Sequence, residues 1–383
     1  MINLVSDTID RKDIESLIEW LNQDPIPKLT KGKLTEELEK KWSKKIGSKY
    51  SVFVNSGSSS ILLTLATLVH TNRLKNNKIV IPGLSWSTDL SSPILLNMDP
   101  ILCDCNLTDL SCDLNHLEEI FRLEKPSCFI LVSALGLVPN MDEIIHLCQK
   151  YDVILLEDVC ESMGSKYRGK YLGTFGFASF FSMYFGHHLS TIEGGFINTD
   201  DEDFYHSLLM MRSHGWDRDL PEQKQKKLRL KYEVDDFESL YNFYLPGFNL
   251  RSTDLQAFIG LRSIDKLDDF SIKRNKNFLL YESLILENEI KITINNEDFI
   301  SNFAFPILRE KRSSLIFHLK KNKIEVRPLI AGDISQKPIW TERNKRIELP
   351  NCSQVNSKGF YLPNHQDLTT DDIVFICEIL NKY

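Results

Sequence analysis

Apolar residues recur at helical spacing in the first fifty residues of the chain. Ile14 and Ile18 belong to one such pattern, which predicts an amphipathic helix over residues 10–23. The same spacing predicts a second helix over residues 34–46, and Gly47 directly after it is a typical helix end. The chain is therefore expected to begin with two helices.

From residue 50 onward, short apolar runs alternate with amphipathic segments. The runs are YSVFV, KIVIP, PILCDC, CFILVSAL, VILLED, ASFFSM and GFINTD. Helical spacing lies between several of them, at residues 114–122, 141–150 and 201–212. Such alternation predicts an α/β fold with a largely parallel sheet covered by helices. Ligands in that architecture bind beyond the carboxyl ends of the strands.

The pattern changes in the last third of the chain. Helical spacing covers residues 252–265, 269–287, 310–322 and the C-terminus, and only NFAFPIL and IEVRPLI are strand-like. We therefore expect a large domain over residues 1–248 and a smaller C-terminal α+β domain over residues 249–383.

A charged segment precedes this change. Residues 222–238, EQKQKKLRLKYEVDDFE, show little periodicity and predict an exposed loop. Its five cations either form a solvated surface or steer a phosphorylated substrate.

Composition narrows the class of protein. The 383 residues are 42% hydrophobic and 26% charged, as in an ordinary globular protein. The net charge of -7 argues against a general binder of nucleic acid or membrane surfaces. Met1–Asp10 carries no signal pattern, and the eight cysteines lie mostly in apolar segments, so we expect a reduced, cytoplasmic protein. Cys103 and Cys105 lack zinc-site spacing, and no metal site is expected.

Two stretches suggest ligand chemistry. NSGSSS, which contains Gly57 and Ser58, lies between a strand and a helix, where exposed N–H groups favour an anion; the alternative is a simple helix cap. FSMYFGHHLSTIEGG, residues 181–195, holds a histidine pair that is either ordinary or an acid/base site. Its two final glycines suit a turn that closely approaches another backbone. Asp158 ends an apolar run and is either a solvated acid or the partner of a ligand cation.

Seven motifs occur in order along the chain: SGSSS, PGLSW, EDVCES, FSMYFGHHLSTIEGG, RSHGW, LPGFNLR and IEVRPL. As a set they resemble the sugar-nucleotide aminotransferase family over roughly residues 10–380. The resemblance implies the type I fold of pyridoxal phosphate (PLP)-dependent transferases, with a mostly parallel seven-stranded sheet in the large domain. It also implies a homodimer with shared active sites.

One departure from the family pattern changes the expected chemistry. The aminotransferases carry a lysine where this chain has His187, and residues 181–195 contain no lysine. The resemblance then implies that PLP or pyridoxamine phosphate (PMP) is held non-covalently. His187, with Glu161 in place of the usual glutamine, is similar to the coenzyme-B6-dependent 3-dehydratases of dideoxysugar biosynthesis, above all those that act on GDP-linked sugars in the colitose pathway.

A related group of dehydratases also holds an iron–sulfur cluster through cysteines after the histidine motif. Such a cluster normally needs four thiolates. This chain has no cysteine between Cys160 and Cys352, so no iron–sulfur cluster is expected there.

The resemblance assigns roles to individual residues. The cofactor-binding residues it implies are Gly57, Ser58, Trp86, Asp158, Glu161, Ser162, Ser182 and Asn249. In this assignment Trp86 stacks on the pyridine ring, Asp158 faces the ring nitrogen, and Asn249 reaches the cofactor of the neighbouring subunit. The substrate-binding candidates are His214, Arg251 and Arg327. Each of these could instead be a structural hydrogen-bonding group or a surface ion pair.

The expected reaction is removal of the 3-hydroxyl from a nucleotide-linked 4-keto-6-deoxy hexose, with His187 as the catalytic base. L-Glutamate converts PLP to PMP, and 2-oxoglutarate and ammonia are released. One alternative is a nucleotide-sugar aminotransferase that tolerates the histidine. Another is a regulator or scaffold that keeps the fold without catalysis, although no basic or helix-turn-helix extension favours it.

Overall fold

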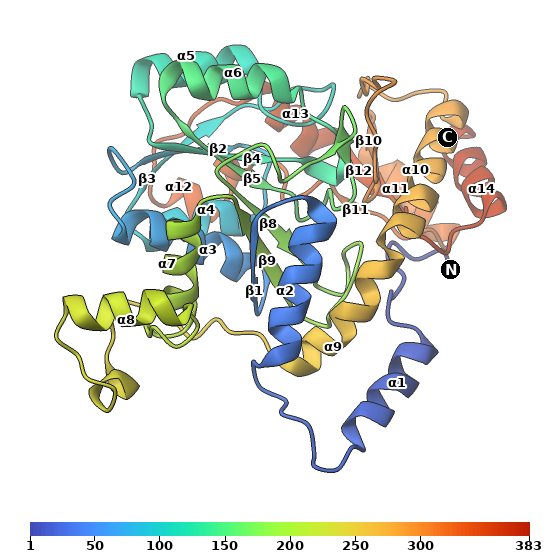
Figure 1. Cartoon of the computed structure of the whole chain (residues 1–383). Coiled ribbons are helices and arrows are strands. Elements are labelled where there is room, and N and C mark those ends of the chain that lie inside the picture. Colours follow the sequence, from blue (N-terminus) through green and yellow to red (C-terminus); the bar gives the residue numbers. More distant parts are fainter.

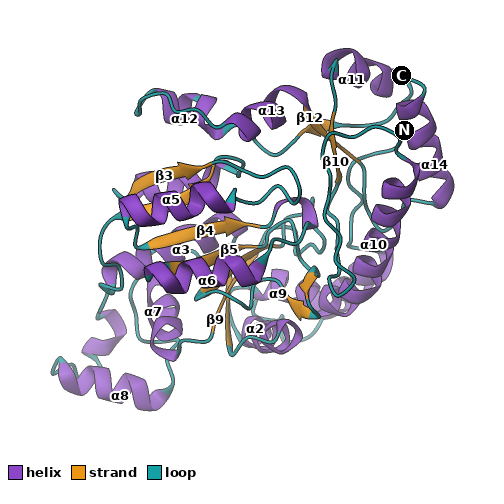
Figure 2. Ribbon diagram, turned by 90° about the horizontal axis from the view of Figure 1, so that it is seen from above, coloured by secondary structure: helices purple, strands orange, loops and turns teal.

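The computed structural model describes residues 1–383 as a central sheet covered by helices, with a second, smaller sheet beside it (Figures 1 and 2). The strands are β1 (Tyr50–Val54), β2 (Lys78–Pro82), β3 (Asp99–Cys103), β4 (Cys128–Val132), β5 (Ile154–Asp158), β6 (Lys166–Tyr167), β7 (Lys170–Tyr171), β8 (Ala178–Ser182), β9 (Gly195–Thr199), β10 (Phe305–Leu308), β11 (Arg327–Pro328) and β12 (Gly359–Leu362). The helices are α1 (Arg11–Leu21), α2 (Lys33–Ile46), α3 (Gly57–His70), α4 (Ser87–Leu95), α5 (Leu114–Glu124), α6 (Met141–Tyr151), α7 (Glu202–Arg212), α8 (Glu222–Lys231), α9 (Asp254–Ser263), α10 (Leu267–Leu284), α11 (Arg312–Lys321), α12 (Pro338–Thr341), α13 (Pro350–Lys358) and α14 (Thr370–Asn381).

The central sheet has seven strands in the order β1-β9-β8-β5-β4-β2-β3. The pairs from β8 to β3 are parallel, whereas β9 runs antiparallel to both β1 and β8. The predicted mostly parallel seven-stranded sheet is confirmed. The carboxyl ends of β4, β5 and β8 therefore meet at one edge, where ligands bind in this architecture.

Alternate residues of each central strand pack against different helices, because successive side chains point to opposite faces. Phe53, Phe129 and Phe181 face a core built with α2, α5 and α6. Val54 and Phe180 face the core shared with α3 and α7. The sheet is thus buried on both faces, which explains its nearly continuous apolar strands.

The second sheet, in the order β10-β12-β11, is antiparallel and lies near α10, α11 and α14 (Figure 2). The N-terminus joins this part of the molecule, since Ile2 donates its N–H to Lys323 O at 2.9 Å. α9 follows the expected boundary at residue 248 yet packs near α2, where Asp254 accepts the Gly32 N–H at 2.8 Å. The division at residue 248 stays a prediction.

Two sequence expectations were wrong. Residues 222–238 are not a loop throughout, because α8 occupies Glu222–Lys231 and projects from the body (Figure 1). None of its residues is buried, so it has no apolar stripe that a sequence pattern could show. Ion pairs support it instead, including Arg229 Nε to Asp217 Oδ2 at 2.7 Å. The expected strand IEVRPLI shrinks to the two residues of β11.

None of the helices combines the length and the apolar character needed to cross a bilayer.

Candidate active site

A cavity of about 870 Å³ lies at the carboxyl ends of β4, β5 and β8. The start of α3 and the loop after β8 form one wall, and segments of the C-terminal third form the other. The sequence-predicted residues that line it are Gly57, Ser58, Trp86, Asp158, Glu161, Ser182, His187 and Arg327. The fold thus brings eight of the twelve candidates to one cavity.

The first turn of α3 presents hydrogen-bond donors to this cavity. The Ser56 side chain caps the helix by accepting the Ser59 N–H at 3.0 Å. The N–H groups of Gly57 and Ser58 precede the first helical hydrogen bond and stay available to a ligand. Gly57 also packs tightly, because a Cβ there would lie 2.8 Å from the Ser182 Cβ. With the hydroxyls of Ser58 and Ser182, this turn can bind a phosphate.

Gly195 allows the histidine loop to approach that turn. A Cβ at this position would lie 2.4 Å from Ser56 O and 2.6 Å from Gly57 N. Any side chain would therefore displace the backbone of the phosphate-binding turn. The expectation of a close approach to another backbone is confirmed for Gly195, whereas a Cβ at Gly194 would meet the side chains of Thr191 and Phe53.

His187 lies in the loop between β8 and β9 and lines the cavity. Its ring centroid lies 5.4 Å from that of Phe303, and its Nδ1 has no hydrogen-bond partner. Removal from water lowers the pKa of His187 to about 4, and the Arg274 guanidinium adds to this effect. The imidazole is therefore neutral at pH 7 and can accept a proton.

The second histidine has different surroundings. His188 is fully buried, and its Nε2 lies 2.8 Å from Ser301 O. A carbonyl oxygen only accepts, so Nε2 carries the proton and donates it. Ser301 is held in turn by its N–H, which donates to Ser165 Oγ at 2.9 Å. His188 therefore ties the loop to the residue 301 segment and does not line the cavity.

Two acids lie at the end of β5. Asp158 Oδ1 accepts the Cys160 N–H at 2.9 Å, and Glu161 Oε2 accepts the Leu135 N–H at 3.1 Å. Burial raises the pKa of Glu161 to about 8, and the nearby Asp158 carboxylate also raises it. Glu161 therefore keeps its proton at neutral pH and can act as a hydrogen-bond donor.

Four candidates lie outside the cavity lining. Ser162 is buried behind it, where its hydroxyl donates to Ser133 O and accepts the Gly136 N–H at 3.0 Å. His214 packs on Trp216, with ring centroids 4.9 Å apart. Asn249 is exposed, and its Oδ1 accepts a hydrogen bond from Arg251 Nε at 3.0 Å. Within one chain, therefore, the structure does not bring these four residues to the cavity.

The C-terminal wall adds residues that the sequence did not single out. Arg312 donates to Asn356 O at 2.6 Å, and Lys337 Nζ donates to Asn356 Oδ1 at 3.2 Å. Both cations line the cavity together with Arg327 and Tyr361. They occur in polar stretches with no motif, and only the tertiary fold places them opposite β5.

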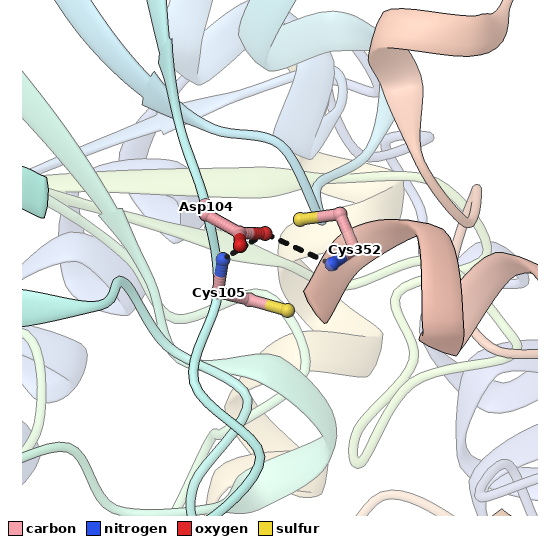
Figure 3. Close-up of side chains that lie close together, drawn as sticks. All are labelled: Asp104, Cys105 and Cys352. Atoms are coloured by element: carbon pink, nitrogen blue, oxygen red, sulfur yellow. Dashed lines mark hydrogen bonds between the residues drawn. The ribbon is translucent and has the colours of Figure 1, made fainter. Parts of the chain in front are cut away.

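A further polar cluster, Asp104, Cys105 and Cys352, links the end of β3 to α13 (Figure 3). Asp104 Oδ1 accepts the N–H groups of Cys105 at 3.0 Å and Cys352 at 2.9 Å, and Oδ2 accepts that of Asn351 at 3.0 Å. α13 has no side-chain cap of its own. Asp104 therefore replaces the missing cap and fixes the helix whose Val355 and Asn356 line the cavity.

The residues present fit a phosphorylated aromatic cofactor such as PLP. The donors at the start of α3 suit its phosphate, and Trp86, 58% exposed at the cavity, offers a ring face. The Asp158 carboxylate can accept a hydrogen bond from a protonated ring nitrogen. No lysine stands in the loop between β8 and β9, and the only lysine lining the cavity is Lys337 on the opposite wall.

Comparison with known proteins agrees with this site. Residues 7–381 match the DegT/DnrJ/EryC1/StrS aminotransferase family. The chain belongs to this family. Among DegT/DnrJ/EryC1/StrS proteins it is 33% identical to GDP-4-keto-6-deoxy-D-mannose 3-dehydratase of Yersinia pseudotuberculosis, covering 100% of this chain and 99% of the relative.

Solved structures of the DegT/DnrJ/EryC1/StrS family give the same result. GDP-4-keto-6-deoxymannose-3-dehydratase with a trapped PLP-glutamate geminal diamine has a TM-score of 0.90 at 30% identity, covering 99% of this chain and 100% of that one. A mutant of that enzyme with bound GDP-perosamine has a TM-score of 0.88 at 30% identity over the same shares. The expected type I fold is confirmed.

Proposed function

We propose that this protein is a PLP/PMP-dependent dehydratase that removes the 3-hydroxyl of a nucleotide-linked 4-keto-6-deoxy hexose, with GDP-4-keto-6-deoxy-D-mannose as its substrate. The observation that carries the proposal is the neutral imidazole of His187 in the cavity, in a loop without lysine. Similarity to a 3-dehydratase over the whole chain supports it.

The residues of the cavity have separate roles. Bound cofactor supplies an electron sink for carbanion chemistry. Gly57, Ser58 and Ser182 would hold its phosphate, and the Asp158 carboxylate would accept a hydrogen bond from its protonated ring nitrogen. His187 accepts and returns a proton through its imidazole, a type of catalysis typically worth about 10²–10⁴-fold in rate. Trp86 covers the ring.

Glu161 carries a proton at neutral pH, whereas His187 can accept one. Its pKa of about 8 leaves the carboxyl neutral at pH 7, in the same cavity as a base, His187, whose pKa is about 4. Two groups whose pKa values are separated in this way suit acid and base roles at one pH. We infer that Glu161 donates its proton to an oxygen in the cavity, while His187 removes one from carbon.

The substrate class follows from the opposite wall. Arg312, Arg327 and Lys337 place three cations on one side of the cavity. A nucleotide diphosphate is the matching anion. GDP as the nucleotide is supported by the names of the similar dehydratases, and L-glutamate as amine donor by the glutamate complex of one of them.

We also propose a homodimer with shared active sites. Tyr184 and Phe185 in the histidine loop are 45% and 44% exposed, which a second subunit would cover. Asn249 is exposed and outside its own cavity, so it is free to reach the cofactor of the partner, as the family resemblance implies.

The clustered thiols of Cys105 and Cys352, which lie close together without a disulfide, support a reducing compartment such as the cytoplasm.

Product analysis tests the function. The protein, PLP, L-glutamate and GDP-4-keto-6-deoxy-D-mannose are incubated together and the nucleotide sugar is weighed by mass spectrometry. A dehydratase yields a 3-deoxy keto sugar and free ammonia. A stable amino sugar that retains its 3-hydroxyl would instead identify an aminotransferase.

A further inference from the structure

Asp89 is a buried acid directly behind the cavity wall. It lies in the first turn of α4, whose Ser87 and Thr88 line the cavity next to Trp86. Asp89 itself is 0% exposed and does not line the cavity. Neither of its carboxyl oxygens forms a well-aligned hydrogen bond with an N–H or O–H donor. Buried polar groups are rarely left in this state.

The partner of Asp89 is a second acid. Its carboxyl is in hydrogen-bond contact with that of Asp158, and no lysine, arginine or histidine forms an ion pair with either residue. The other ionisable groups that act on this pair are acidic too, Glu161 and the Cys160 thiol. Two buried carboxylates in contact cannot both be ionised without a nearby cation, so one proton must lie between them.

The surroundings determine which acid holds that proton. Asp158 faces the cavity and accepts the Cys160 N–H at 2.9 Å, which stabilises its anion. The only backbone donor that acts on Asp89 is the Trp86 N–H, and its effect on the pKa is smaller than the effects of burial and of Asp158. Burial raises the pKa of Asp89 well above its usual value, and repulsion by Asp158 raises it further. Burial also raises the pKa of Asp158, but the hydrogen bonds from Cys160 and Asp89 lower it.

We propose that Asp89 is a positioning residue that stays protonated, donates an O–H···O hydrogen bond to Asp158, and thereby presents Asp158 to the cavity as a single fixed negative charge. The assignment of the ring nitrogen of PLP as the group that Asp158 faces rests on the proposed function. Without the Asp89 donor, Asp158 loses a stabilising hydrogen bond and takes up the proton itself. The ring nitrogen would then lose its anionic partner.

Infrared difference spectroscopy of the cofactor-free protein tests directly whether Asp89 carries a proton. A protonated Asp89 gives the C=O stretch of an un-ionised carboxylic acid, and we expect Asp89→Asn to remove that band at pH 7, whereas Asp158→Asn keeps it. Glu161→Gln is the matched control that removes the separate band of Glu161. A band from the pair that survives in Asp89→Asn, or the absence of any such band in the wild type, would overturn the proposal.

PLP labelled with ¹⁵N at the ring tests the consequence. Asp89→Asn keeps a donor in its amide, so we expect PLP to bind within about threefold of the wild type, with the ¹⁵N shift of a protonated ring. Asp89→Leu keeps the branched shape of the side chain but has no donor. It should weaken PLP binding by about tenfold or more, since a hydrogen bond to a charged group is lost, and shift the ¹⁵N signal toward the unprotonated ring.

These outcomes separate the two proposals. An Asp89→Leu protein that binds PLP with wild-type affinity and a protonated ring would contradict the role of Asp89. If Asp89→Leu does not fold, the infrared result on Asp89→Asn still decides. If the wild type bound no PLP at all, the proposed function would fail, while the infrared band would still report the proton on Asp89.

Discussion

The two walls of the cavity differ in the charge of their side chains. The wall formed by the β5 and β8 ends carries acids and a neutral imidazole, and backbone N–H groups donate to two of them, Asp158 and Glu161. The C-terminal wall carries three cations, of which Arg327 is exposed and has a weak ion pair with Glu325 at 3.4 Å. Groups with shifted pKa values suit proton transfer, and a set of three cations suits the binding of a polyanion.

This difference suggests that chemistry and substrate recognition are separable here. Changes on the sheet wall should alter cofactor binding and rate. Changes on the C-terminal wall should alter substrate affinity and leave the cofactor in place.

The largest effect is expected at His187. Replacement by Asn removes the base, and the dehydration rate should fall by about 10²–10⁴-fold while PLP still binds. Replacement by Lys should also abolish dehydration and allow PLP to attach to the chain, visible by absorbance. His146→Asn, an exposed histidine on α6, is the matched control and should behave as the wild type. A rate within a few fold of normal in His187→Asn would exclude this residue as the base.

Arg327→Ala should give the next largest effect, on the opposite wall. Loss of a charge-assisted hydrogen bond to the diphosphate should raise KM for the nucleotide sugar by about 10- to 100-fold. The affinity for PLP, measured by absorbance titration, should not change. Lys337→Ala should act in the same direction. A large loss of PLP affinity in either variant would contradict the separation of the two walls.

Gly195→Ala should damage the phosphate turn. Its Cβ would lie 2.4 Å from Ser56 O, so the backbone must shift, at a cost of about 1–3 kcal/mol. PLP affinity should fall by about tenfold, and the midpoint of thermal unfolding should fall as well. Gly169→Ala is the control: its φ of 79° strains the variant, but nothing lies near its Cβ, so only stability should fall. Equal PLP affinity in both variants would show that Gly195 does not shape the turn.

The smallest predicted effect concerns pH: kcat/KM should change little near neutral pH. His187, with a pKa of about 4, becomes protonated only as the pH falls through that value, so the acid limb should lie well below the usual histidine range. Glu161, with a pKa of about 8, loses its proton as the pH rises through that value and should give the alkaline limb. Glu161→Gln should remove the alkaline limb. Half-maximal activity near pH 6.5 would contradict a desolvated His187.

Strong periodicity explains which parts of the fold the sequence could predict. α2, α5 and α6 each bury one apolar stripe, and the central strands are apolar throughout, so their positions follow from local pattern. α8 has no buried residue, and α4 contains Pro93, so neither resembles an amphipathic helix in sequence. β11 owes its short ladder to β12, a partner more than thirty residues away.

The same distinction applies to the site. Asp158, Ser182 and His187 follow adjacent strands of one sheet, so strand order alone brings them together. Arg312 and Lys337 reach the cavity only through the packing of the C-terminal third, which no local pattern encodes. Asp89 stands in the polar run STDLSS, which is typical of a solvated helix start, and its complete burial appears only in the structure.

Borohydride reduction of the PLP-loaded protein, followed by mass spectrometry of the whole chain and its peptides, tests most directly the claim that an imidazole replaces the cofactor-anchoring amine. We expect the protein mass to stay that of the unmodified chain, and His187→Lys to gain one pyridoxyl group on the peptide that contains residue 187. A pyridoxyl group on the wild-type chain, at Lys337 or at any other lysine, would contradict the account.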